Sequence, residues 1–193
     1  IKAKFFCYLT KLRSNKTHTW KDFVIPKTFQ DVLNSEQKEQ WLEAIRKEME
    51  QLQRLKTWRR CKRKPRKKPI TCRWVFKIKP PTSLNAEPIF KARLCAHGFK
   101  QKEQDYGATF AQVATMKAFR ILLWIATYLN LRPTQLDVKN AFLNAKIDTE
   151  IYMHPPPGFE NIGFVRLQKT IYGLKQSPRL WRQTLVSKLT QLN

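Results

Sequence analysis

One of the few carboxylates in this chain stands where a divalent cation could be bound. Asp137 lies in the segment Gln-Leu-Asp-Val, which predicts a short strand over 135–138 that runs into the turn-forming residues after it. Hard cations such as Mg²⁺ are bound by carboxylate oxygens held at the end of a rigid element. An aspartate that caps a turn would occupy the same place, and the residues alone favour that simpler role.

A second chemical feature is a run of cations between residues 56 and 80. This segment contains twelve Lys and Arg and no acid, which is half of the formal net charge of +24. Such a surplus favours a polyanionic partner, most often nucleic acid. The candidate nucleic-acid-binding residues are Arg59, Arg60, Lys62, Arg63, Lys64, Arg66, Lys67 and Lys68. Because unpaired like charges repel in a packed element, residues 59–68 are predicted to form an exposed loop. A solvated loop or a localisation signal is the alternative.

The four cysteines do not suggest a metal site or a disulfide framework. Cys7, Cys61, Cys72 and Cys95 form no Cys-x-x-Cys pair, so we expect reduced, buried or incidental thiols and an intracellular compartment. No stretch of about 20 apolar residues predicts a membrane span. No secretory signal is visible, and the first residue is Ile1 rather than Met, which suggests a fragment.

The first half of the chain predicts a helix followed by a basic hairpin. Residues 1–28 form a basic stretch of weak periodicity, expected to be a linker or peripheral arm. Asn34, with Gln37 as its partner, is expected to cap an amphipathic helix that ends near Leu55. Alternating apolar residues predict strands over 73–79 and 89–96, joined by the turn-rich segment 80–88.

The second half predicts two helices and a further pair of strands. Residues 115–131 have the pattern of a largely buried helix, and a helix is expected from Pro178 to the end. Residues 151–154 and 164–167 are predicted to form paired strands, separated by a Pro-Pro-Pro-Gly break. Irregular alternation of helices and strands favours the α+β class.

Short motifs then follow one another along residues 29–193. The series is Trp41 with Glu48, Thr57-Trp58, Arg73 to Lys77, Lys91 to Leu94, Gly98-Phe99, Gln101, Asp105-Tyr106, Thr109 to Ala111, Arg120, Gln135 to Val138, Ala141 to Leu143, Ile151 to Met153, Pro157 to Phe159, and Tyr172 to Arg179 with Trp181. In this order and spacing, the series resembles the reverse transcriptase of copia-type LTR retrotransposons.

The resemblance implies a right-hand polymerase, with fingers and part of the palm within 29–193. It implies RNA-directed DNA polymerisation by two-metal phosphoryl transfer, with Mg²⁺, or alternatively Mn²⁺, as the cofactor. The implied partners are an RNA or DNA template-primer and dNTP, with no membrane. The implied location is a cytoplasmic particle or the nucleus.

The resemblance also assigns roles to particular residues. Asp137 matches the first catalytic, metal-binding aspartate. Phe142 matches the aromatic under the incoming sugar, where a flat ring excludes a 2′-hydroxyl, although a core phenylalanine would look the same. Lys77, Lys91 and Arg93 are candidate triphosphate contacts, Arg93 first because its fork binds phosphate bidentately. Gln176 is a candidate nucleotide contact in a constrained turn.

Three departures from the family pattern bear on activity. Gln104 and Gln112 replace a usual glycine and proline, and the family's Tyr-x-Asp-Asp aspartates have no counterpart because no acid follows Pro178. The thumb, RNase H and the rest of the palm are also missing. We therefore expect a truncated domain that is inactive alone. The competing hypotheses are a non-catalytic basic module that binds nucleic acid and an unstable pseudogene product.

Overall fold

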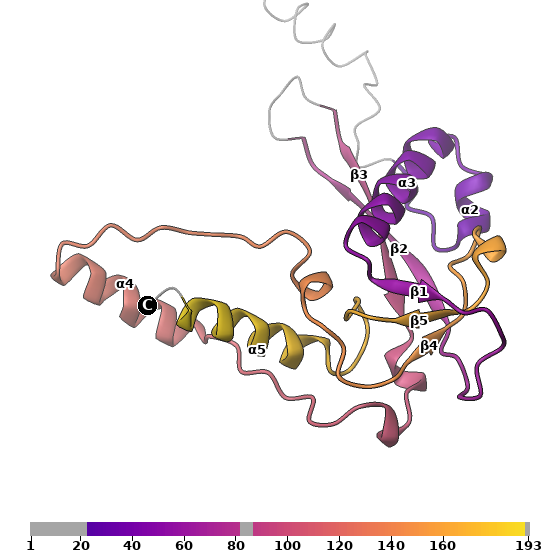
Figure 1. Cartoon of the computed structure of the whole chain (residues 1–193). Helices are drawn as coiled ribbons and strands as arrows, with labels where there is room; N and C mark the ends of the chain where they lie inside the picture. Colours follow the sequence, from indigo (N-terminus) through magenta and orange to yellow (C-terminus); the bar gives the residue numbers. More distant parts are fainter. Residues whose placement is uncertain (1–22, 82–86, 192–193) are drawn as a thin grey trace, which may run out of the picture.

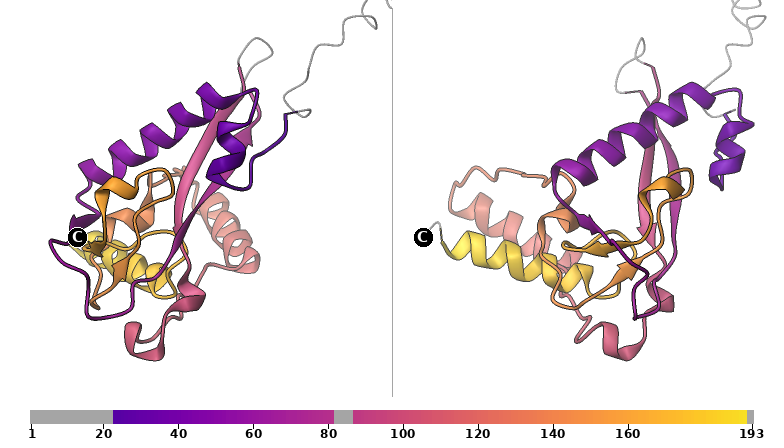
Figure 2. Two further views of the ribbon diagram at one scale, coloured as in Figure 1. Left: turned by 90° about the vertical axis from the view of Figure 1, so that its right-hand side faces the viewer. Right: turned by 45° about the vertical axis from the view of Figure 1, so that its right-hand side comes forward.

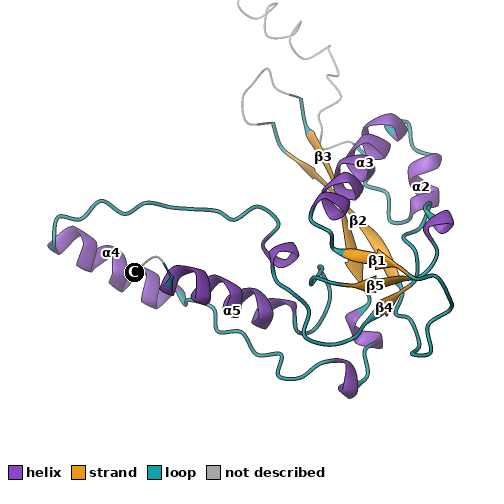
Figure 3. Cartoon of the chain, viewed as in Figure 1, coloured by secondary structure: helices purple, strands orange, loops and turns teal. Residues whose placement is uncertain are grey.

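The structure is a computed structural model that describes residues 23–81 and 87–191. Most of the predicted N-terminal linker 1–28 lies outside these residues, and so does Cys7. The middle of the turn at 80–88 also lies outside them. The described chain is a mixed helix-and-sheet architecture, as the α+β prediction expected (Figures 1 and 3). No helix among the described residues is both long and apolar enough to cross a membrane.

The centre of the molecule is the long hairpin of β2 (Cys72–Lys79) and β3 (Ile89–Ala96). The two strands pair antiparallel over their whole length, from Cys72 opposite Ala96 to Lys79 opposite Ile89. In β2 buried and exposed residues alternate strictly, so Trp74, Phe76 and Ile78 face the core. The hairpin prediction is confirmed, because the period of two in the sequence matches the pleat.

Helix α3 (Lys38–Arg54) covers the apolar face of the hairpin (Figure 2). Trp41 is fully buried, and its ring meets those of Phe76 and Phe90 edge-on at centroid distances of 5.3 and 4.7 Å. Ile45 and Leu52 continue the same helical face into the core. The amphipathic helix predicted in this region is therefore confirmed as a core element.

The predicted start of this helix is wrong. A separate short helix, α2 (Phe29–Leu33), precedes α3, and Asn34 is the C-cap of α2 rather than the N-cap of α3. The reason is a capping box, in which the Thr28 hydroxyl accepts from the Asp31 N–H and the Asp31 carboxylate accepts from the Thr28 N–H. Helix α3 begins after Gln37, which makes no side-chain cap bond.

A second sheet of three short strands lies beside the hairpin, in the order β1-β5-β4. Its strands are β1 (Trp58–Arg60), β4 (Tyr152–Met153) and β5 (Val165–Leu167), and both pairings are antiparallel. The predicted pairing of the segments around 151–154 and 164–167 is confirmed. Strand β1 was not predicted, because three residues dominated by arginine give no apolar alternation.

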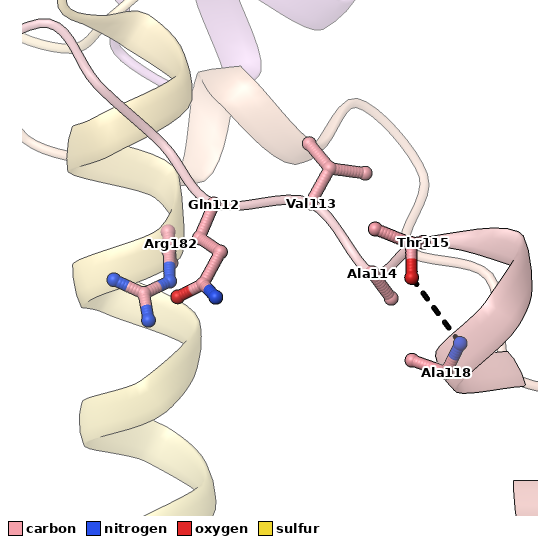
Figure 4. Close-up of a pocket in the computed structure, with 6 residues that line it drawn as sticks. All are labelled: Gln112, Val113, Ala114, Thr115, Ala118 and Arg182. Atoms are coloured by element: carbon pink, nitrogen blue, oxygen red, sulfur yellow. Dashed lines mark hydrogen bonds between the residues drawn. The ribbon is translucent and has the colours of Figure 1, made fainter. Parts of the chain in front are cut away.

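The chain between residues 106 and 138, here called the arm, extends away from these sheets (Figures 1 and 2). It contains helix α4 (Met116–Tyr128), whose N-cap Thr115 accepts from the Ala118 N–H at 3.2 Å (Figure 4). Helix α5 (Ser177–Thr190) runs beside the part of the arm that precedes α4. Figure 4 shows Arg182 of α5 lining one pocket with Gln112.

Two predictions for the arm are wrong. Helix α4 forms, but only Ala126 is buried, and Trp124 remains 68% exposed. Residues 135–138 form no strand and are exposed. The predicted burial of 115–131 and the predicted strand at 135–138 both rest on local pattern, whereas burial and strand pairing depend on a neighbouring surface. Among the described residues, Ala126 is the one residue of α4 that a neighbouring surface buries.

Candidate nucleotide and nucleic-acid site

The outer face of the β2-β3 hairpin is strongly basic. The cations on this face are Arg73, Lys77, Lys79, Lys91 and Arg93. Lys77 lies directly opposite Lys91 in the register, so two like charges share one cross-strand position. Such pairs destabilise a sheet unless an anion lies between them. Partial burial, together with nearby Lys79 and Arg93, lowers the pKa of Lys91.

Arg93 is the cation of this face that meets an aromatic cluster. Its guanidinium carbon lies 5.3 Å from the centroid of the Tyr172 ring, and Tyr172 meets Phe142 edge-on at 5.4 Å. The Tyr172 hydroxyl donates to Oδ1 of Asn140 at 3.5 Å. The structure therefore brings together Arg93 and Phe142, two of the predicted nucleotide-site residues from distant parts of the sequence.

Backbone packing fixes Tyr172 in this position. The N–H of Ala96, at the end of β3, donates to the carbonyl of Tyr172 at 2.8 Å. The next residue, Gly173, has a φ of +89°, and a Cβ there would lie 2.1 Å from the Ala96 carbonyl oxygen. Only glycine fits such a close approach with this backbone conformation. Burial raises the pKa of the Tyr172 hydroxyl.

Tyr172 and Asn140 are members of the cluster for which the sequence predicted no individual role. Tyr172 opens the motif that continues to Arg179, but its contact with Arg93 across 79 positions has no local signal. Asn140 has a φ of +52°, a left-handed conformation that asparagine tolerates better than most residues. An asparagine directly before Ala141-Phe142 in a turn was the available hint.

Behind the hairpin, Glu48 of α3 is a buried carboxylate close to the same cations. Its Oε1 accepts from the backbone N–H of Leu94 at 3.4 Å. Burial raises the pKa of Glu48, and this effect is partly opposed by the Leu94 N–H and by Arg93 and Lys91. The contact holds the strand segment that carries Arg93 against the helix.

Gln176 lies away from the exposed cluster. It is fully buried, its Oε1 accepts from Nε2 of Gln101 at 3.0 Å, and its Nε2 donates to the Asp105 carbonyl at 3.1 Å. The Gln101 Oε1 in turn accepts from the Lys175 N–H at 2.9 Å. These bonds give Gln176 a structural role between two segments of the chain, and no atom of it reaches the surface near Arg93.

Asp137 lies in the exposed, irregular part of the arm, three residues before Asn140. The described residues contain no group of three or more acidic, histidine or cysteine side chains that could hold a metal ion. A single exposed carboxylate does not make a site for two divalent cations. The arrangement of the described residues therefore does not fit the two-metal centre that the resemblance implies.

The candidate nucleic-acid-binding residues are all exposed. Arg59 and Arg60 belong to β1 rather than to the predicted loop, and the Arg60 guanidinium donates to the Asn161 carbonyl at 2.8 Å. The remaining six residues lie in the loop between β1 and β2, as predicted. None of the eight forms an ion pair with a carboxylate within the described part of the chain.

Comparison with known proteins supplies independent information. Residues 55–193 match the sequence profile of a family described as "Reverse transcriptase (RNA-dependent DNA polymerase)". The chain is 40% identical over 161 residues to the Retrovirus-related Pol polyprotein from transposon TNT 1-94 of Nicotiana tabacum, covering 81% of the chain and 12% of that polyprotein.

Two further relatives show the same relation. The polyprotein from transposon RE2 of Arabidopsis thaliana is 44% identical over 119 residues, which is 58% of the chain and 8% of the polyprotein. The Transposon Ty1-BL Gag-Pol polyprotein of Saccharomyces cerevisiae is 35% identical over 164 residues, which is 79% of the chain and 9% of the polyprotein. The chain thus spans a small part of each of these relatives. No solved structure matches it.

Proposed function

Because the chain belongs to the reverse transcriptase family of copia-type retrotransposon Pol polyproteins, we propose that residues 29–193 hold the nucleotide and the template in RNA-directed DNA synthesis. In this proposal the β2-β3 hairpin belongs to the fingers, and the residues from the arm onward belong to the beginning of the palm. The observation that carries the proposal is the cluster of Arg93, Tyr172 and Phe142 beside the basic face of the hairpin.

Arg93 is the principal triphosphate-binding residue in this proposal. Its guanidinium is exposed on the strand and oriented by the Tyr172 ring, so its planar donors are available to phosphate oxygens. Lys77 and Lys91 add positive charge on the same face, and an anion between them relieves their mutual repulsion. Phe142, packed against Tyr172, is placed to meet the sugar of the nucleotide.

Reverse transcriptases depend in general on divalent metal ions, and Asp137 is the proposed carboxylate ligand from this chain. The ions would neutralise charge on the phosphates and the attacking oxygen. Since one carboxylate cannot hold two such ions, we propose that these 193 residues alone do not extend a primer. Phosphate binding by the hairpin, in contrast, needs only the cations already present on its face.

The nucleotide role is tested by titrating the 193-residue chain with a fluorescent dNTP. We expect Arg93→Ala to weaken binding about tenfold or more, because a charge-assisted hydrogen bond contributes about 1.5–3 kcal/mol. Arg54→Ala, which removes an exposed arginine at the end of α3, is the matched control and should leave the affinity unchanged. Equal affinity of the Arg93→Ala variant and the unsubstituted chain would overturn the role of Arg93.

The lack of activity is tested separately by primer extension with Mg²⁺ or Mn²⁺. We expect no template-dependent product from the 193-residue chain, because its residues supply only one of the required carboxylates. Template-dependent extension that is lost in Asp137→Asn would contradict this expectation and would show that other carboxylates complete the site.

A second candidate function is a non-catalytic module that binds nucleic acid. The exposed cations without acidic partners between β1 and β2 favour it. Nucleic-acid binding that falls steeply with salt, combined with dNTP binding that does not depend on Arg93, would support this function over the first.

A further inference from the structure

The loop between β1 and β2 carries a run of cations at the side of the three-stranded sheet (Figure 1). Six of the eight residues from 62 to 69, here called the basic loop, are Lys or Arg, and all six are exposed. They are Lys62, Arg63, Lys64, Arg66, Lys67 and Lys68. None of them forms an ion pair with a carboxylate between residues 23–81 or 87–191. Their charge is therefore available to a partner.

The basic loop is anchored at both ends and leaves its own backbone unused. The Cys61 N–H donates to the Phe164 carbonyl at 2.8 Å, and the Ile70 N–H donates to the Tyr152 carbonyl at 2.9 Å. Within the part of the chain that the structure describes, no backbone–backbone hydrogen bond begins or ends at residues 62–69. The peptide groups of the loop are thus open to the donors and acceptors of a partner.

Two prolines keep the basic loop out of regular secondary structure. Pro65 interrupts the cations after Lys64, and Pro69 follows the last of them. Proline lacks the N–H that a helix interior or a central strand requires, and it disfavours helical backbone at the preceding residue. The described chain accordingly has neither a helix nor a strand between Arg60 and Cys72. The cations therefore lie on an irregular, accessible segment.

Two kinds of polyanion suit such a segment, and its backbone distinguishes between them. Nucleic acid binds cations through its phosphates and uses mainly their side chains. No residue from 62 to 69 is aromatic, so the loop offers no ring on which a base could stack. A protein groove lined with carboxylates, in contrast, binds a short segment through its side chains and through its peptide groups. Consecutive exposed cations with unused peptide groups favour the protein groove.

We infer that the basic loop is bound by a nuclear import receptor, in a groove that carboxylates line. Segments of about five to eight residues rich in Lys and Arg are the class of signal that directs proteins to the nucleus. The inference goes beyond the proposed function, because it concerns the transport of the chain rather than DNA synthesis. It uses no residue of the Arg93 cluster, so either proposal can fail while the other stands.

The binding test is fluorescence anisotropy of the labelled 193-residue chain with purified importin α that lacks its autoinhibitory segment. Two triple variants remove the charge on either side of Pro65. They are Lys62→Ala/Arg63→Ala/Lys64→Ala and Arg66→Ala/Lys67→Ala/Lys68→Ala. We expect each variant to weaken binding about tenfold or more, because each removes charge-assisted hydrogen bonds to carboxylates.

The matched control removes the same charge from a different surface. Lys117→Ala/Arg120→Ala/Lys188→Ala changes exposed cations on α4 and α5. Since every variant loses the same charge, a general attraction to an acidic protein would weaken all of them alike. We expect the control to bind importin α as the unsubstituted chain does. All substituted side chains are exposed, so circular dichroism should show unchanged folding.

Transport is tested in permeabilised cells, with the chain fused to a carrier protein too large to diffuse through nuclear pores. We expect the fusion to accumulate in nuclei when cytosol and an energy source are supplied, and the fusions of both triple variants to remain outside. An excess of a free import-signal peptide rich in Lys and Arg should block the accumulation, because it competes for the receptor groove. Accumulation that the peptide does not block would indicate retention by nucleic acid and would count against the inference.

Three binding results would overturn the inference: no binding of importin α by the unsubstituted chain, unchanged affinity in both triple variants, or equal weakening in the control. Triple variants that bind duplex DNA more weakly but importin α as before would assign the basic loop to nucleic acid instead. Weakening of importin α binding in only one triple variant would support the inference and locate the receptor contact on that side of Pro65.

Discussion

Helices α3 and α4 show opposite relations between composition and burial. Helix α3 carries charges along most of its length, yet it buries six side chains against the hairpin. Helix α4 consists mostly of apolar residues, yet it buries only Ala126. An apolar stripe therefore becomes part of a core only where another element presents a complementary surface. The hairpin provides that surface to α3, whereas only Ala126 of α4 is buried among the described residues.

The largest expected difference between the two helices comes from their tryptophans. We expect Trp41→Ala to lower the free energy of unfolding by about 3–5 kcal/mol, because its ring fills the core between Phe76 and Phe90. Trp124→Ala should change it by no more than about 0.5 kcal/mol, because the Trp124 side chain is largely exposed. Urea unfolding followed by far-ultraviolet circular dichroism measures both. Equal losses would show that α4 is packed as firmly as α3.

A smaller effect is expected at the junction between the packed region and the arm. Gln176→Ala should cost about 1–3 kcal/mol, because the Gln101 amide and the Asp105 carbonyl would lose buried partners. Gln183→Ala, an exposed glutamine on α5, is the matched control, and thermal unfolding compares the two variants. If both variants have the same melting temperature as the unsubstituted chain, the buried amide network does not hold the start of the arm.

The smallest effect concerns the buried carboxylate behind the hairpin. Burial raises the pKa of Glu48, so its stabilising contribution is present below the ordinary glutamate pKa and is lost as pH rises through the raised value. Glu48→Gln should therefore gain stability relative to the unsubstituted chain as pH increases through this window. Urea midpoints measured across the acidic range test the trend. A difference that is independent of pH would show that Glu48 is solvated.

Local periodicity predicted the parts of the molecule that pack on one another. The alternation in β2 and the helical spacing of Trp41, Ile45 and Leu52 were sufficient, because both apolar faces meet. The boundary at Asn34 was missed because the capping box of Thr28 and Asp31 lies before the apolar run. Strand β1 was missed because its pairing with β5 depends on residues more than 100 positions away.

For the candidate site, the sequence predicted residue types better than their arrangement. Arg93 and Phe142 do lie in one cluster, but Tyr172, which joins them, is identified only by the fold. Gln176 was predicted from its motif to face a nucleotide and instead serves the interior. The strand expected to carry Asp137 is absent from the described residues, because a strand requires a partner that its own sequence cannot specify.

The close approach of Gly173 to the end of β3 also limits how this chain can diverge. A Cβ on Gly98 would lie 2.0 Å from the Gly173 carbonyl oxygen, and one on Gly173 would meet the Ala96 carbonyl. A side chain at Gly98 would require the backbone at Gly173 to move, and a side chain at Gly173 would require the backbone at Ala96 to move. The two glycines, 75 residues apart in the sequence, therefore act as one mutational unit. Copies of this domain that accumulate substitutions should lose the Arg93 and Tyr172 contact as soon as either glycine is replaced.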